Sequence, residues 1–339
     1  MNTLGIESSC DETSVAILTK DEIRANLISS QDFHVEYGGV VPELSSRAHI
    51  QIITKLVRDA IKKSKLKLDD INLICASAGP GLIGALMVGF NFGKALAYSR
   101  QIPFIPVDHI EGHIFSGFLM NDKPEFPFLS LVVSGGHTLL LIVKNDLEII
   151  KLGSTQDDAA GEAFDKIAKM IGLGYPGGPR IQEYSKKGNP DRFKFPIARL
   201  KNKFDFSFSG LKTAVYRFLS QNYSDLQTLS QNELSDISAS VQKSIVSALT
   251  EKVILATNEH NIKSISLVGG VASNLTLRKS LEEIACKYEK KIVIPDFKLC
   301  SDNAAMIAYR GYKLFTNGKT YPMEYSCYPS LRGEMFTKF

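Results

Sequence analysis

The sequence predicts an α/β fold made of two similar units, and three observations indicate this. Residues 3–7 and 13–19 are short apolar runs with strand character, joined by a polar turn. The same strand-turn-strand pattern returns at 128–133 and 138–143. Glycine pairs follow the apolar runs that end at 133 and 268. This recurrence favours internal duplication of a strand-rich unit over two chance hairpins.

The length of the chain agrees with two units. At 339 residues it exceeds the size of about 250–300 residues at which a single hydrophobic core stops growing. The polar segment 121–124 has the composition of a linker. We therefore expect one lobe to comprise residues 1–120 and about 302–339. The other lobe then comprises residues 121–301, including a basic insertion at 180–217.

Composition narrows the class of protein. A hydrophobic content of 44% and a charged content of 22% are ordinary for a soluble globular protein, and the net charge of +4 only weakly indicates an anionic partner. Five dispersed cysteines without a C-x-x-C pair fit a reducing cytosol. The N-terminus lacks the features of a signal peptide, and glycine and proline at 79–81 interrupt the uncharged stretch 73–91. We expect a cytoplasmic protein without a membrane segment.

The spacing of apolar residues predicts further elements. Helices are expected at 47–64, from Gly84 to near Arg100, and at 233–258. Ser301 is the expected N-cap of a last helix. Additional strands are expected at 71–77, 104–107, 264–268 and 291–295.

A pair of histidines follows the strand at 104–107. His109 and His113 are four residues apart, so on a helix they share one face and can hold one metal ion. Asp302 would complete a set of two histidines and one carboxylate, which suits a catalytic Fe(II) or Zn(II). The alternatives are two unrelated histidines near a turn and an ordinary acid in the first turn of a helix. The zinc-peptidase motif H-E-x-x-H requires glutamate where this chain has Ile110, so a peptidase is a poor geometric match.

A glycine motif in the first half has two interpretations. Gly79, Gly81 and Gly84 match the G-x-G-x-x-G fingerprint of dinucleotide-binding proteins, with a strand before and a helix after. On that interpretation the protein is an NAD-dependent dehydrogenase. However, the motif is not at the start of the chain, and Asp108, the expected ribose-binding acid, abuts a candidate metal ligand. The alternative is a turn that allows a helix to pack closely on a strand.

The segment 180–217 is strongly basic. It contains ten lysines and arginines but only three acids, with aromatic residues between them. Such a run suits an anionic surface such as RNA, or it forms a solvated face over core phenylalanines, of which Phe204, Phe206 and Phe208 alternate like a strand. The cations that carry this prediction are Lys186, Lys187, Arg192, Lys194, Arg199, Lys201 and Lys203.

Two sets of motifs carry resemblances. The glycine loops at 134–136 and 269–270, together with the polar turn 8–12, resemble the phosphate loops and adenosine clamp of the actin, Hsp70 and sugar-kinase superfamily. Nine motifs in order, reaching about residue 312, are similar to the tRNA N6-adenosine threonylcarbamoyltransferase family, of the bacterial TsaD type. These motifs are Gly5–Ser14, Gly79–Gly81, His109–His113, Val133–Thr138, Gly161–Lys166, Tyr175–Pro179, Phe206–Lys212, Gly269–Asn274 and Ser301–Asn303.

The resemblance implies both a fold and a set of functional residues. The fold is an ATPase-domain fold of two similar lobes with the ligand between them. The metal ligands are His109, His113 and Asp302, with Fe(II) the expected ion and Zn(II) the alternative. Gln182 stands where some relatives carry an acid, and we assign it no contact. The implied substrate-binding residues are Val132, Val133, Ser134, Gly135, Gly136, Asp165, Gly178 and Asn274.

The resemblance also implies an activity. It is transfer of threonylcarbamoyl from threonylcarbamoyl-AMP to N6 of adenosine 37 in tRNAs that read ANN codons. Glu12 is a candidate for a catalytic role. The expected partners are a paralogous inactive subunit of the TsaB type and a small P-loop ATPase of the TsaE type. The family was formerly labelled O-sialoglycoprotein endopeptidase, which the Ile110 argument disfavours. A non-catalytic, chaperone-like ATP-binding protein remains an alternative.

Overall fold

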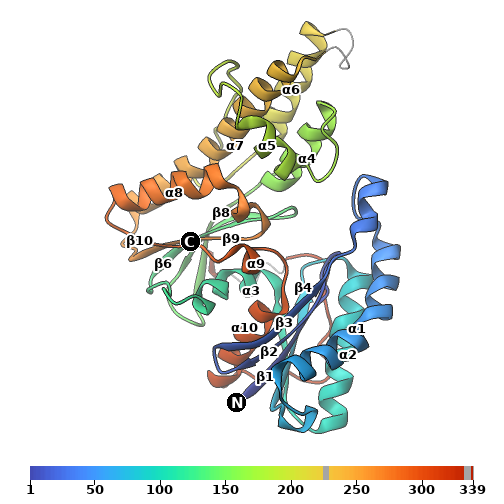
Figure 1. Ribbon diagram of the computed structural model, residues 1–339. Coiled ribbons are helices and arrows are strands. Elements are labelled where there is room, and N and C mark those ends of the chain that lie inside the picture. Colours follow the sequence, from blue (N-terminus) through green and yellow to red (C-terminus); the bar gives the residue numbers. More distant parts are fainter. Residues whose placement is uncertain (224–228, 332–336, 339) are drawn as a thin grey trace. The chain divides into compact units, whose positions relative to one another are not determined.

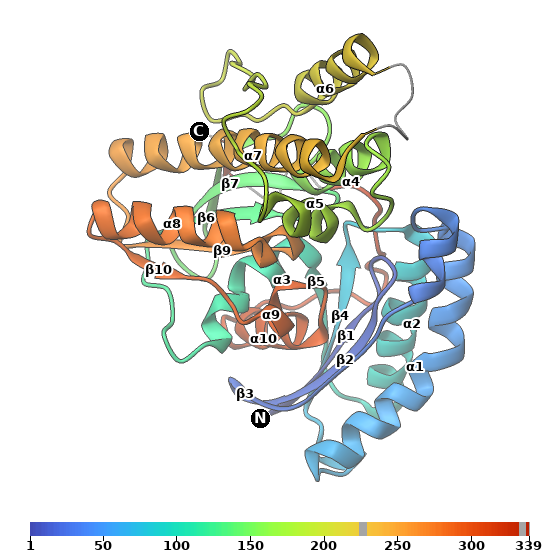
Figure 2. The same cartoon turned by 45° about the horizontal axis from the view of Figure 1, so that its top comes forward.

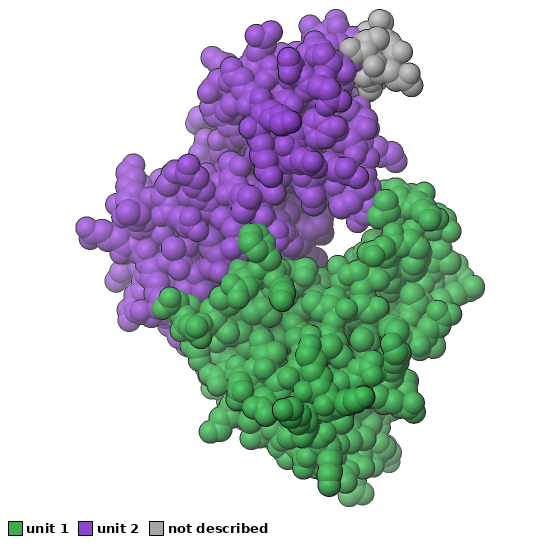
Figure 3. Space-filling model, in the orientation of Figure 1, with its two compact units in different colours: residues 1–123, 295–335 green, residues 124–294, 336–339 purple. Residues whose placement is uncertain are grey.

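The computed structural model describes residues 1–223, 229–331 and 337–338 (Figure 1). The chain forms two compact units, which are coloured separately in Figure 3. Unit 1 comprises Met1–Lys123 and Pro295–Met335, and unit 2 comprises Pro124–Ile294 and Phe336–Phe339. In the parts described, no helix is both long enough and apolar enough to cross a membrane.

Unit 1 is built on a five-stranded sheet. Its strands are ordered β3-β2-β1-β4-β5, with antiparallel pairing from β1 to β3 and parallel pairing from β1 through β4 to β5. The central strands are buried along nearly their whole length, as expected for strands covered on both faces. The strands are β1 (Asn2–Glu7), β2 (Thr13–Thr19), β3 (Glu22–Ser29), β4 (Leu73–Gly79) and β5 (Phe104–Asp108).

Helices cover both faces of this sheet. Because side chains alternate along a strand, Ile74 of β4 belongs to the apolar core under α1 and α2, whereas Leu73 and Cys75 belong to the core under α10. Figures 1 and 2 show α1 and α2 together on one face and α10 on the other. The helices are α1 (Pro42–Ser64), α2 (Ile83–Arg100), α3 (His109–Phe115), α9 (Phe297–Cys300) and α10 (Ala304–Thr316), with 3-10 turns η1 (Asp32–Tyr37), η2 (Leu68–Asp70) and η3 (Ser116–Leu119).

Unit 2 repeats the same sheet topology. Its order is β10-β9-β6-β7-β8-β11, in which β6, β7 and β8 are antiparallel neighbours and β9 and β10 extend the sheet in parallel. The run β8-β7-β6-β9-β10 therefore corresponds strand for strand to β3-β2-β1-β4-β5, which confirms the predicted duplication. The strands are β6 (Phe128–Val133), β7 (Thr138–Val143), β8 (Ile149–Ser154), β9 (Ser264–Val268), β10 (Lys291–Val293) and β11 (Thr337–Lys338).

The helices of unit 2 include a long one that spans the sheet. α7 packs on β6, α8 packs on β9 and β10, and α5 packs against both α4 and α7. A capping box fixes the start of α7, since Ser230 Oγ accepts the N–H of Glu233 and Glu233 accepts the N–H of Ser230. The helices are α4 (Ala160–Met170), α5 (Gly177–Ser185), α6 (Ser209–Asn222), α7 (Gln231–Glu259) and α8 (Leu275–Lys287), with the 3-10 turn η5 (Gly270–Ser273).

One local prediction is wrong, and another is confirmed only in part. α10 begins at Ala304, and its N-cap is Asn303 rather than Ser301, because the Asn303 side chain accepts the N–H of Met306. Phe204, Phe206 and Phe208 are buried, but they form no strand beyond a single bridge from Phe206 to Thr155. The alternating apolar residues here therefore belong to a loop of unit 2 whose phenylalanine side chains are buried, and not to a sheet.

Candidate metal centre and ligand pocket

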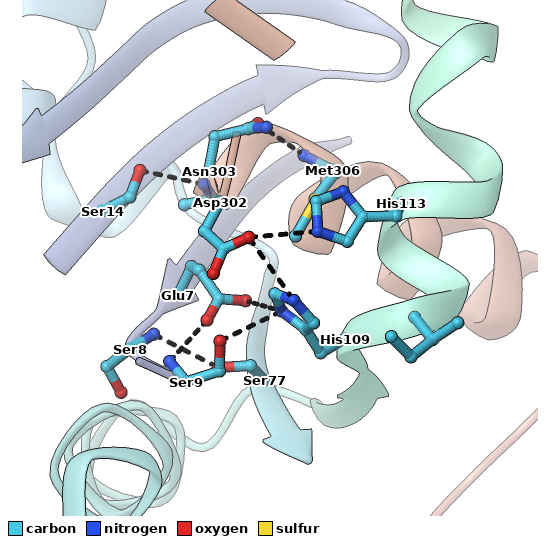
Figure 4. Close-up of polar contacts among 12 residues, drawn as sticks. Glu7, Ser8, Ser9, Ser14, Ser77, His109, His113, Asp302, Asn303 and Met306 are labelled. Carbon is cyan, nitrogen blue, oxygen red and sulfur yellow. Dashed lines mark hydrogen bonds and ion pairs between the residues drawn. The ribbon is translucent and has the colours of Figure 1, made fainter. Parts of the chain in front are cut away.

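The two histidines and Asp302 meet at the carboxyl end of β5. α3 begins directly after this strand, and its N-cap Asp108 accepts the N–H groups of Ile110 and Glu111. The imidazole centroids of His109 and His113 are 4.7 Å apart, as successive turns of one helix face require. Their Nε2 atoms lie 3.5 and 3.1 Å from Oδ1 of Asp302 (Figure 4). The three ligand atoms all lie within 4.8 Å of one another.

Asp302 is held in place by the start of α10. It occupies the turn between α9 and α10, next to the cap residue Asn303. The N–H of Ala304 donates to Oγ of Ser14 on β2, so the turn is tied to the central sheet (2.9 Å). Residues from α3 and the α9–α10 turn thus build one centre, and Ser14 of β2 holds that turn, although they are far apart in sequence (Figure 4).

The Nδ1 atom of His109 faces the end of β1. It lies 3.1 Å from Oε2 of Glu7 and 3.1 Å from Oγ of Ser9. The other Glu7 oxygen accepts the N–H of Ser9, and the Glu7 side chain is fully buried. A buried carboxylate on Nδ1 fixes one proton there, so Nε2 is the nitrogen that would offer its lone pair to a metal ion beside Asp302. In contrast, Nδ1 of His113 is buried without a hydrogen-bond partner among the described residues.

The charges of this centre suit a cation. Burial lowers the pKa of His109, but the carboxylates of Asp302 and Glu7 outweigh it and raise the pKa to about 10. Burial lowers the pKa of His113. Two imidazole nitrogens and one carboxylate form a donor set that divalent iron or zinc accepts. A bound metal ion would replace the proton that His109 otherwise holds, so the residues fit the expected ion.

Glu12 lies in the turn that follows β1. Burial, with the nearby acids Asp302 and Asp11, raises the pKa of its carboxyl to about 9. Without a bound cation, these surroundings favour the neutral form of the carboxyl. A divalent ion beside it would lower this pKa, so the protonation of Glu12 depends on the occupant of the centre.

Unit 2 contains a separate pocket of about 190 Å³. Four predicted substrate-binding residues line it, namely Gly135, Asp165, Gly178 and Asn274. Val132, Val133, Ser134 and Gly136 are not among its lining residues, and the two valine side chains are buried in β6. Gly270, from the predicted phosphate loop 269–270, also lines the pocket. No contact was predicted from the sequence for the other lining residues, which are Gly161, Phe164, Pro179, Gln182, Val271 and Ser273.

The polar side chains of this pocket are fixed by backbone groups. Oδ1 of Asp165 accepts the N–H of Gly177 at the start of α5, while burial raises the pKa of the carboxyl. Asn274 caps α8 by accepting the N–H of Leu277. Oε1 of Gln182 accepts the N–H of Leu275, so its amide nitrogen is the group left for a ligand. Phe164 could have been predicted as a pocket residue from the sequence, because it belongs to the motif Gly161–Lys166 and directly precedes Asp165.

The glycines of the dinucleotide-like motif face protein atoms. A β-carbon at Gly79 would lie 2.1 Å from the carbonyl oxygen of Tyr328, and one at Gly81 would lie 2.4 Å from that of Ser9. At Gly84 it would meet Oγ of Ser46. Protein atoms therefore fill the space that a dinucleotide phosphate would need. The glycines allow other parts of the chain to pack closely against this turn.

The basic segment is exposed. All seven predicted cations are exposed, and Lys203 pairs with Glu259 of α7. The only acid among them, Asp191, pairs with Lys243. For the other six cations, residues 1–223 and 229–331 provide no ion pair. Their charge is thus available to an external anion.

Comparisons with known proteins point to one family. The family model described as "TsaD: tRNA N6-adenosine threonylcarbamoyltransferase" matches residues 22–309. A relative of that name from Prosthecochloris aestuarii is 46% identical over 98% of this chain and 100% of its own length. Another from Pelodictyon phaeoclathratiforme is 48% identical over 91% of each chain.

Solved structures with low identity share the fold. The HypF protein of T. kodakarensis superposes with a TM-score of 0.65 at 13% identity, over 94% of this chain and 48% of HypF. Component A of (R)-2-hydroxyglutaryl-CoA dehydratase from Acidaminococcus fermentans gives a TM-score of 0.55 at 17% identity, over 94% of this chain and 100% of that protein. Together with the duplicated sheets, these likenesses support the predicted ATPase-like fold class.

Proposed function

Because the chain belongs to the TsaD family of tRNA N6-adenosine threonylcarbamoyltransferases, we propose that it transfers a threonylcarbamoyl group to N6 of adenosine in tRNA. The observation that carries this proposal is the 46% identity to a full-length relative of that name over 98% of the chain. More specifically, we propose that the donor is threonylcarbamoyl-AMP and that the acceptor is adenosine 37 of tRNAs that read ANN codons. The dehydrogenase alternative loses its basis, since protein atoms fill the space beside Gly79 and Gly81.

The adenylate donor is assigned to the pocket of unit 2. The Asp165 carboxylate can accept hydrogen bonds from ribose hydroxyls, because it lines the pocket and is only partly buried. A β-carbon added at Gly135 or Gly178 would have no protein atom within 4 Å apart from adjacent residues and, for Gly178, the backbone of its own helix, so a ligand can approach their backbone. Asn274 lies at the start of α8, and the positive end of the helix dipole there favours an anion such as the phosphate leaving group. The backbone of 132–136 remains a proposed contact.

The metal ion is assigned to His109, His113 and Asp302, with Fe(II) as the expected ion and Zn(II) as the alternative. When bound, such an ion supplies a Lewis acid that polarises a carbonyl or orients the donor. Glu7 holds His109 in one tautomer, and Asp302 faces both imidazoles. Glu12 is retained as a candidate for proton transfer, because burial and the nearby acids raise the pKa of its carboxyl and favour the protonated form.

The tRNA surface is assigned to the exposed cations of the basic segment that have no ion pair in the described part of the chain. Their exposure and the pairing of Asp191 with Lys243 leave a local excess of positive charge. Phosphate contacts by such cations supply affinity without sequence preference. The six cations are Lys186, Lys187, Arg192, Lys194, Arg199 and Lys201.

The remaining expectations belong to the same proposal. They are partner subunits of the TsaB and TsaE types and a cytoplasmic location. We also propose that the two units are the expected lobes. One lobe is residues 1–120 with about 302–339, and the other is residues 121–301.

A transfer assay with purified components tests this function. The protein is incubated with threonylcarbamoyl-AMP, tRNA and its partner subunits, and the tRNA nucleosides are quantified by mass spectrometry. We expect His109→Ala, His113→Ala and Asp302→Ala each to lose bound metal and transfer while remaining folded. Asp122→Ala, which changes an exposed acid outside the centre, is the matched control. Full metal occupancy in all three variants would remove these residues from the metal centre.

A further inference from the structure

The C-terminal tail of unit 1 packs against the turn that follows β4. Tyr328 donates its N–H to the carbonyl of Ala78, and Pro329 accepts the N–H of Gly81. Nζ of Lys94 on α2 donates to the carbonyl of Tyr325. The Tyr328 side chain is only 7% exposed. This tail lies beyond residues 22–309, to which the family model is matched.

Gly79 makes this close approach feasible. Its φ of +145° is rare for residues with a side chain, and a β-carbon would lie 2.1 Å from the Tyr328 carbonyl oxygen. The same β-carbon would also meet the Tyr328 ring at 2.6 Å. Tyr328 is therefore seated against the backbone of β4, and its ring direction is fixed by packing.

The hydroxyl of Tyr328 reaches the start of the metal-binding helix. It donates to Oδ2 of Asp108 at 2.7 Å. Oδ1 of the same carboxylate accepts the N–H groups of Ile110 and Glu111, at 2.8 and 3.0 Å. One buried carboxylate thus joins the tail to the first turn of α3. His109 directly follows Asp108, so the helix turn that this carboxylate caps carries a predicted metal ligand.

α3 depends on such external contacts because it has only seven residues. Isolated helices of fewer than about 12 residues are not stable in water, since few backbone hydrogen bonds offset the cost of nucleation. Its second anchor is the ion pair between Glu111 and Arg310 of α10, at 2.6 Å, with Arg310 stacked over Phe115. That contact restrains the side of the helix, whereas Asp108 restrains its beginning.

We propose that Tyr328 is a positioning residue of the metal centre, which acts through Asp108 to hold the first turn of α3 and therefore His109. This inference rests on the proposed metal site. Loss of the hydroxyl leaves one oxygen of a buried carboxylate without its donor, and the carboxylate is then free to rotate away from the cap geometry. Outer contacts that orient metal ligands typically change metal affinity by about 10–100-fold when removed.

Zn(II) binding to the full-length protein tests this role. Tyr328→Phe keeps the ring in its packed position and removes only the hydroxyl. We expect the dissociation constant for Zn(II), measured by chelator competition, to rise about tenfold. We expect the thermal midpoint of the metal-free protein to change little, because the ring keeps its packing. Tyr98→Phe is the matched control, because the Tyr98 side chain is 74% exposed on α2.

A double-mutant cycle separates this role from general stability. Asp108→Asn retains an acceptor for the helix cap but removes the charge that Tyr328 contacts. The effect of Tyr328→Phe on Zn(II) affinity should be largely lost in the Asp108→Asn background. Additive effects, or unchanged affinity in Tyr328→Phe, would refute the positioning role. His109→Ala is measured in parallel, because wild-type affinity in that variant would refute the metal site itself.

Discussion

The glycines at and just after the end of β4 resemble in sequence the glycines around the pocket of unit 2, but the two pairs have different surroundings. At Gly79 and Gly81 a β-carbon would collide with backbone atoms of Tyr328 and Ser9. At Gly135 and Gly178 the same atom would find no neighbour within 4 Å. The first pair permits close packing of protein on protein, and the second pair leaves backbone accessible to a ligand. A glycine motif therefore indicates a close approach, but the approaching group must be found in the structure.

Gly79→Ala gives the largest expected effect on stability. The β-carbon would clash with a backbone oxygen, and the residue would keep an unfavourable φ, so we expect a loss of about 3 kcal/mol or more in the free energy of unfolding. Urea denaturation measures this loss. Gly84→Ala is the control, since its β-carbon meets only the rotatable Oγ of Ser46. Equal stability of the two variants would contradict the packing role of Gly79.

Gly177→Ala and Gly178→Ala sharpen the comparison within unit 2. Gly177 is packed, with its β-carbon position 2.5 Å from Cα of Asp165, so its substitution should destabilise the protein. Gly178→Ala should leave stability nearly unchanged but weaken adenylate binding by about tenfold, because the added methyl occupies ligand space. Calorimetry with a non-hydrolysable adenylate checks this. Unchanged adenylate affinity in Gly178→Ala would show that the adenylate does not bind in this pocket.

Asn274 offers a smaller and more selective test. Its side chain both lines the pocket and caps α8, so Asn274→Ala is expected to lose adenylate affinity and about 1 kcal/mol of stability. Asn274→Ser retains a capping oxygen and should recover most of the stability. If Asn274 binds the adenylate, affinity should remain reduced in Asn274→Ser. Asp165→Ala should likewise weaken adenylate binding more than tRNA binding.

Several of these features were accessible from sequence. Short apolar runs located β1, β2, β6 and β7, and their recurrence predicted the duplicated topology, because pairing of adjacent strands is local. The i, i+4 spacing placed His109 and His113 on one helix face. Contacts between residues far apart in the chain could not be predicted from spacing. Examples are the contacts of Asp302 with His113 and of Tyr328 with Asp108.

The remaining errors have local physical causes. Both Ser301 and Asn303 can cap a helix, and the choice depends on the turn that follows α9. Helices α5 and α6 lie within or beside the basic segment, where polar and glycine-rich sequence masks the helical period. Glu7 was only a strand residue in the sequence, and its role beside His109 emerges from three-dimensional contact.

The basic segment gives the smallest expected effect per residue. Replacement of Lys186, Lys187, Arg199 and Lys201 by Gln should weaken tRNA binding and reduce the slope of log K against log salt by roughly two to four. Adenylate binding and metal content should remain, because these side chains lie outside both sites. Lys62 and Lys63, exposed on α1, provide a control for the loss of surface charge. An unchanged slope would make the segment a solvated face, with tRNA bound elsewhere.

Modification of tRNA is tested most directly by nucleoside mass spectrometry of cellular tRNA. Cells that lack this protein should lose N6-threonylcarbamoyladenosine, and the wild-type chain should restore it. His113→Ala should not restore it, because a metal ligand is missing, whereas Tyr98→Phe should. Normal levels of the modified nucleoside in the absence of the protein, without a second enzyme of this family in the cell, would contradict the transferase function.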